Sequence, residues 1–151
     1  MVEIKTMKIQ NIPHLLEMIE QKYVSVHKHP AEELYIYNYT PKTQFDRVWN
    51  DVTLQTRGLI LDGEYNIVAR PFKKFFNYEE LKQEDIPNLP FEIFEKYDGS
   101  MIIAFYYKNA WFVASRGSFI SEQAQKGKEL FNKLCISCLN IENTYIFEIL
   151  Y

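Results

Sequence analysis

The sequence predicts an α+β fold in which helices pack on antiparallel sheets. Aromatic residues make up 16% of the 151 residues, and aromatic side chains favour the pleated, half-buried surfaces of sheets. Short apolar runs bounded by Gly, Pro, Asn or Asp alternate with segments of helical periodicity. Hydrophobic residues reach 47%, which excludes an intrinsically disordered chain.

The first helix is expected at residues Asn11–Tyr23. Asn11 is a suitable N-cap and Pro13 fits the first turn. The apolar residues of this segment share one helical face: Ile12, Leu15, Leu16 and Ile19. A strand is expected next at Tyr35–Tyr39, because aromatic and branched residues there run up to the turn signal Thr40-Pro41.

A second helix and a hairpin follow in the prediction. Thr43 is a candidate cap for the helix, whose apolar residues have helical spacing: Phe45, Val48, Trp49 and Val52. The hairpin pairs Gly58–Leu61 with Ile67–Arg70 around Asp62-Gly63, a dipeptide that suits a tight turn.

The second half is predicted to be mostly strands. Leu81–Pro90 is expected to be an irregular connection, because it contains two prolines and several charges. Four strands are expected, at Phe91–Lys96, Met101–Tyr107, Trp111–Ser115 and Thr144–Tyr151. Ser121 is expected to cap a helix over Ser121–Leu134, with these residues facing inward: Ala124, Leu130, Phe131 and Leu134.

Residues 1–151 are expected to form a single, incomplete domain, because a predicted strand without cap or tail closes the sequence. The net charge of −3 argues against a protein that coats nucleic acid by bulk charge, but it allows a local basic groove. No apolar run is long enough to cross a bilayer, and the N-terminus has no signal-peptide core. We therefore expect a cytoplasmic protein with no membrane partner.

The cysteines and histidines give no protein metal site. Cys135 and Cys138 form one C-x-x-C pair, which is half of a zinc site, and no second pair completes it. The pair closes a predicted helix, whereas redox motifs open one, so we expect two half-buried small side chains. His27 and His29 lack a third ligand.

The strongest candidate for chemistry is Lys96, in the run Glu95-Lys96-Tyr97-Asp98-Gly99-Ser100. An ordinary lysine has a pKa of about 10.4, so it becomes a nucleophile only where burial or nearby cations lower that pKa. A turn that Gly99 permits would bring the Asp98 carboxylate close to the reacting groups. Lys-x-Asp-Gly is also an ordinary turn sequence, so this motif alone does not decide the function.

The Lys96 motif and four other segments resemble, in the same order along the chain, motifs of the covalent nucleotidyltransferases. This group includes DNA ligases, RNA ligases and mRNA capping enzymes. Lys96–Gly99 resembles motif I of these enzymes, Ser115–Ser118 resembles motif Ia, and Phe147–Ile149 resembles motif III. Thr56–Ile60 and Ala69–Asn77 resemble the segments that precede motif I in phage-type RNA ligase 1 and its tRNA-repair relatives. The resemblance runs from Arg57 to Glu148 and covers most of the chain.

The residues after motif I favour RNA ligases within this group. DNA ligases and capping enzymes usually have an arginine two residues after the motif's glycine, and this sequence has Met101 there, preceded by Ser100. The same position argues against DNA as the substrate.

The resemblance implies an ATP-dependent RNA ligase. Lys96 would take AMP from ATP as lysyl-AMP, with Mg²⁺ held through the phosphates and its protein ligands unknown. AMP would then pass to an RNA 5′-phosphate, and an RNA 3′-hydroxyl would displace it in an RNA repair reaction. Broken tRNA is one substrate of this kind, and a phage- or virus-encoded origin fits the relatives named above.

Other residues receive roles from the same resemblance. Glu148 would hold the ribose hydroxyls, since a carboxylate only accepts hydrogen bonds. Arg57 and Lys74 would contact the triphosphate, and Arg116 would lie near the nucleotide or the RNA phosphates. Asp98 would orient the turn that Gly99 permits, or the metal shell, while Glu95 would have a structural role. Ordinary surface charge is the alternative for the basic residues.

Motifs IV and V of the family, which supply a further carboxylate and phosphate-gripping lysines, have no counterpart in the sequence, and neither has the C-terminal RNA-specificity domain. Three explanations stay open. The chain is part of a longer ligase, or a second chain supplies motifs IV and V, or the chain is a non-catalytic remnant that binds nucleotide or RNA.

Overall fold

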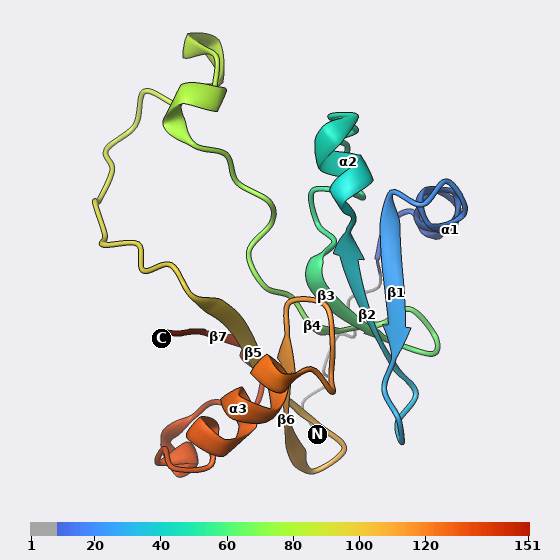
Figure 1. Cartoon of the computed structure of the whole chain (residues 1–151), viewed down its shortest axis with the longest axis vertical. Coiled ribbons are helices and arrows are strands. Elements are labelled where there is room, and N and C mark those ends of the chain that lie inside the picture. The colour runs from blue at the N-terminus through green and yellow to red at the C-terminus, as the bar shows by residue number, and fades with distance from the viewer. Residues whose placement is uncertain (1–8) are drawn as a thin grey trace, which may run out of the picture.

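The computed structural model describes residues 9–151, which form two antiparallel sheets and three α-helices (Figure 1). In the first sheet the strands lie in chain order: β1 (Val24–Lys28), β2 (Leu34–Tyr39), β3 (Arg57–Asp62) and β4 (Ile67–Ala69). The second sheet has the order β6-β5-β7, formed by β5 (Ser100–Tyr107), β6 (Ala110–Ser115) and β7 (Tyr145–Ile149). The helices are α1 (Ile12–Glu20), α2 (Pro41–Phe45) and α3 (Glu122–Phe131). The predicted α+β class is confirmed.

The two sheets pack face to face around a shared core. Leu34 and Ile36 of β2 and Ile60 of β3 lie fully buried in the same cluster as Ile103 and Phe105 of β5. Side chains alternate between the two faces of a strand, so the neighbouring residues of β5 point the other way. The central core is therefore made by alternate residues of strands from both sheets.

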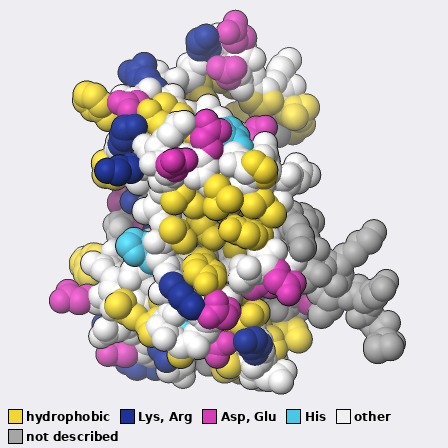
Figure 2. Space-filling model, turned by 90° about the vertical axis from the view of Figure 1, so that its right-hand side faces the viewer, with side chains coloured by type: hydrophobic (Ala, Val, Ile, Leu, Met, Phe, Trp, Pro, Cys, Tyr) yellow, Lys and Arg dark blue, Asp and Glu magenta, His cyan; other side chains and the backbone are white. Residues whose placement is uncertain are grey.

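A helix covers the outer face of each sheet. Helix α1 buries Leu15 and Met18 against Val24 and Leu59 of the first sheet. On the second sheet, Phe131 of α3 packs in a cluster with Ile102. Figure 2 views the face that carries α1 and β1, and hydrophobic side chains gather in its middle. No helix within residues 9–151 is both long and apolar enough to span a bilayer.

Most of the predicted elements are confirmed with small shifts at their ends. Asn11 caps α1 by accepting a hydrogen bond from the His14 N–H at 3.1 Å, and Ser121 caps α3 in the same way for Ala124 at 3.2 Å. The predicted inner faces are partly wrong, because three of their residues are largely exposed: Leu16, Leu130 and Leu134. The sequence does not predict β1, in which only Val24 and Val26 alternate.

The predicted second helix is wrong in position. Helix α2 begins at Pro41 and ends at Phe45, and Thr40 rather than Thr43 is its N-cap. Thr43 is fully buried, and its hydroxyl donates to the carbonyl of Tyr23. Beyond α2 the chain turns, because the Asn50 carboxamide oxygen accepts from the N–H groups of residues 52 and 53 at 2.9 Å each. Such local side-chain bonds compete with helix formation.

The predicted strand at Phe91–Lys96 is also wrong. This segment has no regular secondary structure, and β5 begins only at Ser100. Phe91, Ile93 and Phe94 are 81%, 87% and 77% exposed. A strand needs a neighbour to accept its backbone hydrogen bonds, and no described segment pairs with these residues. The sequence pattern of residues 91–96 therefore does not produce a strand, because no partner strand is present among the described residues.

Gly58 sits where β3 passes against the second sheet. Its φ is +85°, and an added Cβ would lie 2.5 Å from Ile103 Cδ1 and 3.2 Å from the carbonyl oxygen of Arg116. We expect Gly58→Ala to lower the free energy of unfolding by about 2 kcal/mol or more, since backbone strain and overpacking add. Urea denaturation measures this change.

Gly63→Ala is the matched control for that substitution. Gly63 has no positive φ, and its added Cβ would have only ordinary contacts, at 3.8 Å from Glu33. Equal denaturation midpoints for the two variants would contradict the close approach of β3 to the second sheet.

Candidate active site

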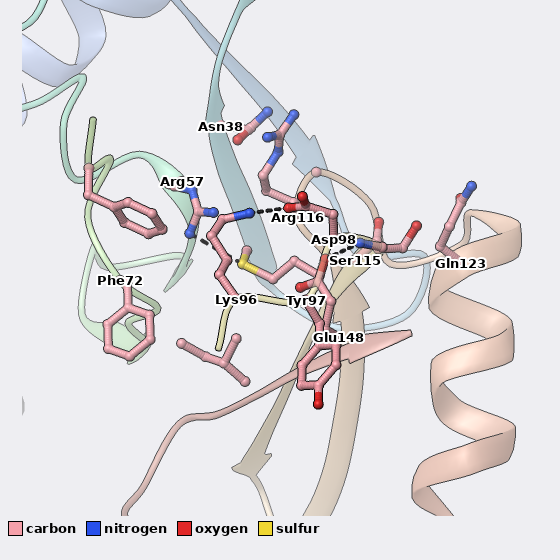
Figure 3. Close-up of a pocket in the computed structure, with 16 residues that line it drawn as sticks. Asn38, Arg57, Phe72, Lys96, Tyr97, Asp98, Ser115, Arg116, Gln123 and Glu148 are labelled. Atoms are coloured by element: carbon pink, nitrogen blue, oxygen red, sulfur yellow. Dashed lines mark hydrogen bonds and ion pairs between the residues drawn. The ribbon is translucent and has the colours of Figure 1, made fainter. Parts of the chain in front are cut away.

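A pocket of about 630 Å³ lies between the first sheet and the edge of the second (Figure 3). Six of the eight site residues predicted from the sequence line it: Arg57, Lys96, Asp98, Gly99, Arg116 and Glu148. They come from β3, the segment before β5, the turn after β6, and β7. The fold therefore brings together residues that are as far apart in the sequence as Arg57 and Glu148.

Lys96 and Asp98 face each other at the pocket. The Lys96 ammonium forms an ion pair and hydrogen bond with the Asp98 carboxylate. Figure 3 shows this amine between Arg57 and Asp98. The two side chains are 64% and 84% exposed, so solvent screens the pair and a ligand can reach both groups.

Gly99 ties the Lys96 segment to β7. Its N–H donates to Glu148 Oε1 at 3.0 Å, and a Cβ at this position would overlap the carbonyl oxygen of Ile149. Met101 pairs with Glu148 in the ladder between β5 and β7, which places the Glu148 side chain beside the turn. A glycine is thus required at position 99 because the Ile149 carbonyl lies so close to it. This contact also fixes the position of the Lys96 segment relative to β7.

Two arginines supply positive charge to the pocket. The Arg57 guanidinium lies 5.0 Å from the centre of the Phe75 ring, and its Nη1 is 3.5 Å from Met101 Sδ. The Arg116 guanidinium lies 5.6 Å from the Tyr39 ring. Neither arginine forms an ion pair with a carboxylate of the described part of the chain. Both are therefore available to an anionic ligand.

Serine hydroxyls fix the turn that carries Arg116. The Ser115 N–H donates to the carbonyl of Ser118 at 2.9 Å, and the Ser121 hydroxyl donates to Ser115 Oγ at 2.9 Å. The Ser118 hydroxyl in turn accepts from the Ser121 N–H at 3.1 Å. This network joins the end of β6 to the start of α3, so Arg116 projects from a braced turn.

Lys74 and Glu95 do not line this pocket. The Lys74 ammonium donates to the carbonyl of Phe75 at 2.7 Å and lies 4.5 Å from the Phe76 ring, in a separate pocket of about 360 Å³ that includes Trp49. Glu95 accepts a hydrogen bond from the Tyr97 hydroxyl at 2.7 Å. That bond raises the pKa of Tyr97.

Comparison with known proteins gives the family. Residues 55–149 match the RNA ligase family, a stretch that contains the six residues named for the pocket. The chain belongs to this family. The resemblance that the motifs predict, to phage-type RNA ligases, is confirmed.

Two relatives of this RNA ligase family member come from viruses. Over 134 residues it is 30% identical to a protein of Autographa californica nuclear polyhedrosis virus assigned as a bifunctional polynucleotide kinase/RNA ligase, covering 81% of this chain and 19% of that protein. Over 111 residues it is 29% identical to an RNA ligase of Rhodothermus phage RM378, covering 57% of this chain and 24% of the phage protein. The chain thus spans about a fifth to a quarter of the length of these relatives.

Sequence reasoning missed several residues of the ligase-family pocket, notably Asn38 and Gln123. Asn38 precedes the matched stretch and lies on β2. The one signal for it is a polar residue inside the aromatic run Leu34–Tyr39. Gln123 lies on the exposed first turn of α3 and has no such signal.

Metal ligands are sparse in this member of the ligase family. Within residues 9–151, no group of three His, Cys, Asp or Glu side chains could hold a metal ion. His29 is instead part of a turn, because its Nδ1 accepts from the N–H groups of Ala31 and Glu32 at 3.1 and 3.0 Å. Burial lowers the pKa of His29.

The C-x-x-C pair is exposed, so the expectation of half-buried side chains is wrong. The two sulfur atoms are 3.6 Å apart, and Cys135 Sγ lies 3.3 Å from the Ser137 hydroxyl. Hydrogen bonds from Ser137 and then Cys138 lower the pKa of the Cys135 thiol.

We expect Cys135 to be alkylated by iodoacetamide faster than Cys138 at pH 7 to 8. A lowered pKa leaves more thiolate at a given pH, and the thiolate is the nucleophile. Peptide mapping by mass spectrometry under reducing conditions measures both rates. Ser137→Ala removes the larger stabilising bond and should slow Cys135; a Cys135 rate unchanged by Ser137→Ala would refute this origin of its reactivity.

Proposed function

We propose that this chain carries the adenylylation chemistry of an ATP-dependent RNA ligase, within a nucleotidyltransferase domain. One observation carries the proposal: a single pocket of a family member joins a reachable lysine to a carboxylate, two arginines without carboxylate partners in the described residues, and Glu148. Amine nucleophile, phosphate-binding cations and a hydroxyl acceptor are the groups that nucleotidyl transfer to a lysine needs.

In the proposed first step, Lys96 Nζ attacks the α-phosphorus of ATP. A P–N bond forms, the bond to the oxygen that bridges the α- and β-phosphates breaks, and pyrophosphate leaves. The amine loses its proton, and the Asp98 carboxylate is in direct contact to receive it. This proton transfer to Asp98 gives the neutral amine, whose lone pair makes the attack.

Arg57 and Arg116 would hold the phosphates by charge-assisted hydrogen bonds. Glu148 Oε1 accepts from Gly99, which leaves its second carboxylate oxygen for a ribose hydroxyl. Mg²⁺ fits a site of this kind, since it is commonly held by one or two carboxylates together with substrate phosphates and water. It would neutralise charge on the triphosphate. The roles of Lys74 and Glu95 stay predictions, as neither side chain lines the pocket.

The later steps would use RNA. AMP would pass from Lys96 to an RNA 5′-phosphate, and an RNA 3′-hydroxyl would attack that phosphate and release AMP. The names of both relatives include RNA ligase, which supports RNA as the substrate, and their viral sources support a phage- or virus-encoded origin. Broken tRNA is one candidate for that RNA. A second chain that supplies motifs IV and V remains part of the proposal, as does the cytoplasmic location.

Self-labelling tests the first step. The purified chain is incubated with Mg²⁺ and ATP labelled on the α-phosphate, and the products are separated by denaturing electrophoresis. We expect label on the wild-type protein and none on Lys96→Ala or Lys96→Arg, because neither variant offers this amine. Lys108→Ala is the control, since Lys108 is exposed, pairs with Glu32 at 3.0 Å, and should leave labelling unchanged.

The label also has to behave as a phosphoramidate. It should be lost in acid or hydroxylamine and kept in mild alkali, and added pyrophosphate should regenerate ATP from the labelled protein. Absence of label on a folded wild-type chain would refute autonomous adenylylation and favour a nucleotide- or RNA-binding role.

A further inference from the structure

The C-x-x-C pair is a reactive feature that the proposed ligase chemistry does not use. Helix α3 ends at Phe131, and the pair lies beyond it, on a separate 3-10 turn, Ile136–Cys138, and the residue before that turn. The pair therefore does not close a helix, and the sequence-based reason against a redox role is removed. Cys135 and Cys138 are both exposed and free, and they are the two cysteines of the whole chain. Any disulfide within one chain must join them.

The backbone of this turn suits a disulfide. The Cys138 N–H donates to the Cys135 carbonyl at 3.4 Å, which is a bond between residues three apart. A turn of this kind brings its first and last Cα atoms within about 7 Å, and disulfides span about 4.4–6.8 Å between Cα atoms. The two sulfur atoms are 3.6 Å apart, so the thiols are in contact. Rotation of two exposed side chains can therefore form the bond.

The surroundings of Cys135 favour its thiolate. Ser137 Oγ lies 3.3 Å from Cys135 Sγ. Hydrogen bonds from Ser137 and then Cys138 lower the pKa of the Cys135 thiol. The thiolate is the species that attacks a disulfide. Cys138 touches Cys135 and has the position of a resolving thiol, so Cys135 is placed to attack first and Cys138 second.

The turn is anchored at its C-terminal end, while its thiols are free. Neither cysteine belongs to a buried cluster of the described residues, and neither lines the Lys96 pocket. Leu139, the next residue, packs against the buried cluster of the second sheet, and the Asn140 N–H donates to the Tyr145 hydroxyl of β7 at 2.8 Å. Within residues 9–151, no three His, Cys, Asp or Glu side chains could bind a metal ion together. The pair therefore lacks the further ligands of a zinc site.

We propose that Cys135 and Cys138 form a reversible thiol–disulfide site whose substrate is a small-molecule disulfide. The Cys135 thiolate attacks one sulfur of that disulfide. The S–S bond of the small molecule breaks, a mixed disulfide forms at Cys135, and a thiolate leaves. The Cys138 thiolate then attacks Cys135 Sγ and displaces the second thiolate. The pair loses two electrons and two protons, and the small disulfide gains them as two thiols.

The resulting disulfide is expected to be labile. Exposed disulfides are reduced more easily than structural ones. In a reducing compartment, disulfides are usually transient and redox-sensing. The pair therefore stays as thiols under reducing conditions and closes when small-molecule disulfides accumulate. This chemistry needs neither Lys96 nor a bound nucleotide, so it stands apart from the proposed function.

Equilibration in glutathione buffers tests the site, with oxidised glutathione as the small-molecule disulfide. The folded wild-type chain is held in mixtures of reduced and oxidised glutathione, quenched with acid, denatured, alkylated and weighed by mass spectrometry. We expect a species that has lost two hydrogen atoms and both alkylation sites. Its share should grow with the proportion of oxidised glutathione and vanish with dithiothreitol. Absence of this species at every ratio, or a chain that carries only glutathione adducts or links to a second chain, would overturn the inference.

Single substitutions assign the two thiols. Cys138→Ser should accumulate a mixed disulfide with glutathione at Cys135, because no thiol is left to resolve it. Cys135→Ser should form its adduct at Cys138 more slowly, because that thiol lacks the hydrogen bond from Ser137 which favours the Cys135 thiolate. An adduct that forms faster on Cys135→Ser would overturn the order of attack.

Unfolding tests whether the folded turn, and not the C-x-x-C spacing alone, makes the site. The wild-type chain is equilibrated in the same glutathione buffers with and without denaturing urea. The folded turn holds the two sulfur atoms 3.6 Å apart, so the share of disulfide at a given buffer ratio should fall when the chain unfolds. A share that is equal or higher in urea would show that the fold contributes nothing to the bond, and would overturn the inference.

Discussion

The contact between Gly99 and β7 is the constraint on which the pocket depends. The Gly99 N–H binds the Glu148 carboxylate at 3.0 Å, and there is no room for a side chain between the turn and the carbonyl of Ile149. The pairing of β5 with β7 continues from this point, with Ser100 opposite Ile149. The pairing of β5 with β7 therefore fixes the position of the Lys96 segment, which precedes β5, and holds Glu148 of β7 beside it.

The charges of the chain divide into satisfied and unsatisfied sets. Outside the pocket, several lysines have carboxylate partners: Lys28 with Glu33 at 2.6 Å, Lys108 with Glu32 at 3.0 Å and Lys126 with Glu129 at 3.0 Å. These exposed pairs contribute at most about 1 kcal/mol each. The two pocket arginines rest instead on aromatic rings, at 5.0 and 5.6 Å. A chain with a net charge of −3 thus keeps a local positive site.

Local signals in the sequence predicted the elements that local contacts decide. Two helix caps, at Asn11 and Ser121, and the hairpin at Asp62-Gly63 depend on neighbours a few residues away. They can therefore be predicted from the sequence. Residues 91–96 have a strand pattern but lack a partner, and pairing is a tertiary property. Motif order likewise selected Lys96 and Glu148, both of which line the pocket. It could not show that Lys74 and Phe75, adjacent in sequence, face different pockets.

Asn38 is another pocket residue that could not be predicted from the sequence. The sequence alone does not place this asparagine of an aromatic strand in the pocket, because Arg116 and Gly117, which line the pocket with it, are nearly eighty residues away. Arg57 and Arg116, which line the same pocket as Asn38, have no carboxylate partner within residues 9–151. Both arginines would be satisfied by the phosphates of one bound nucleotide. Binding of a nucleotide, as proposed, would therefore complete interactions of the two arginines that folding alone leaves open, and would stabilise the folded chain.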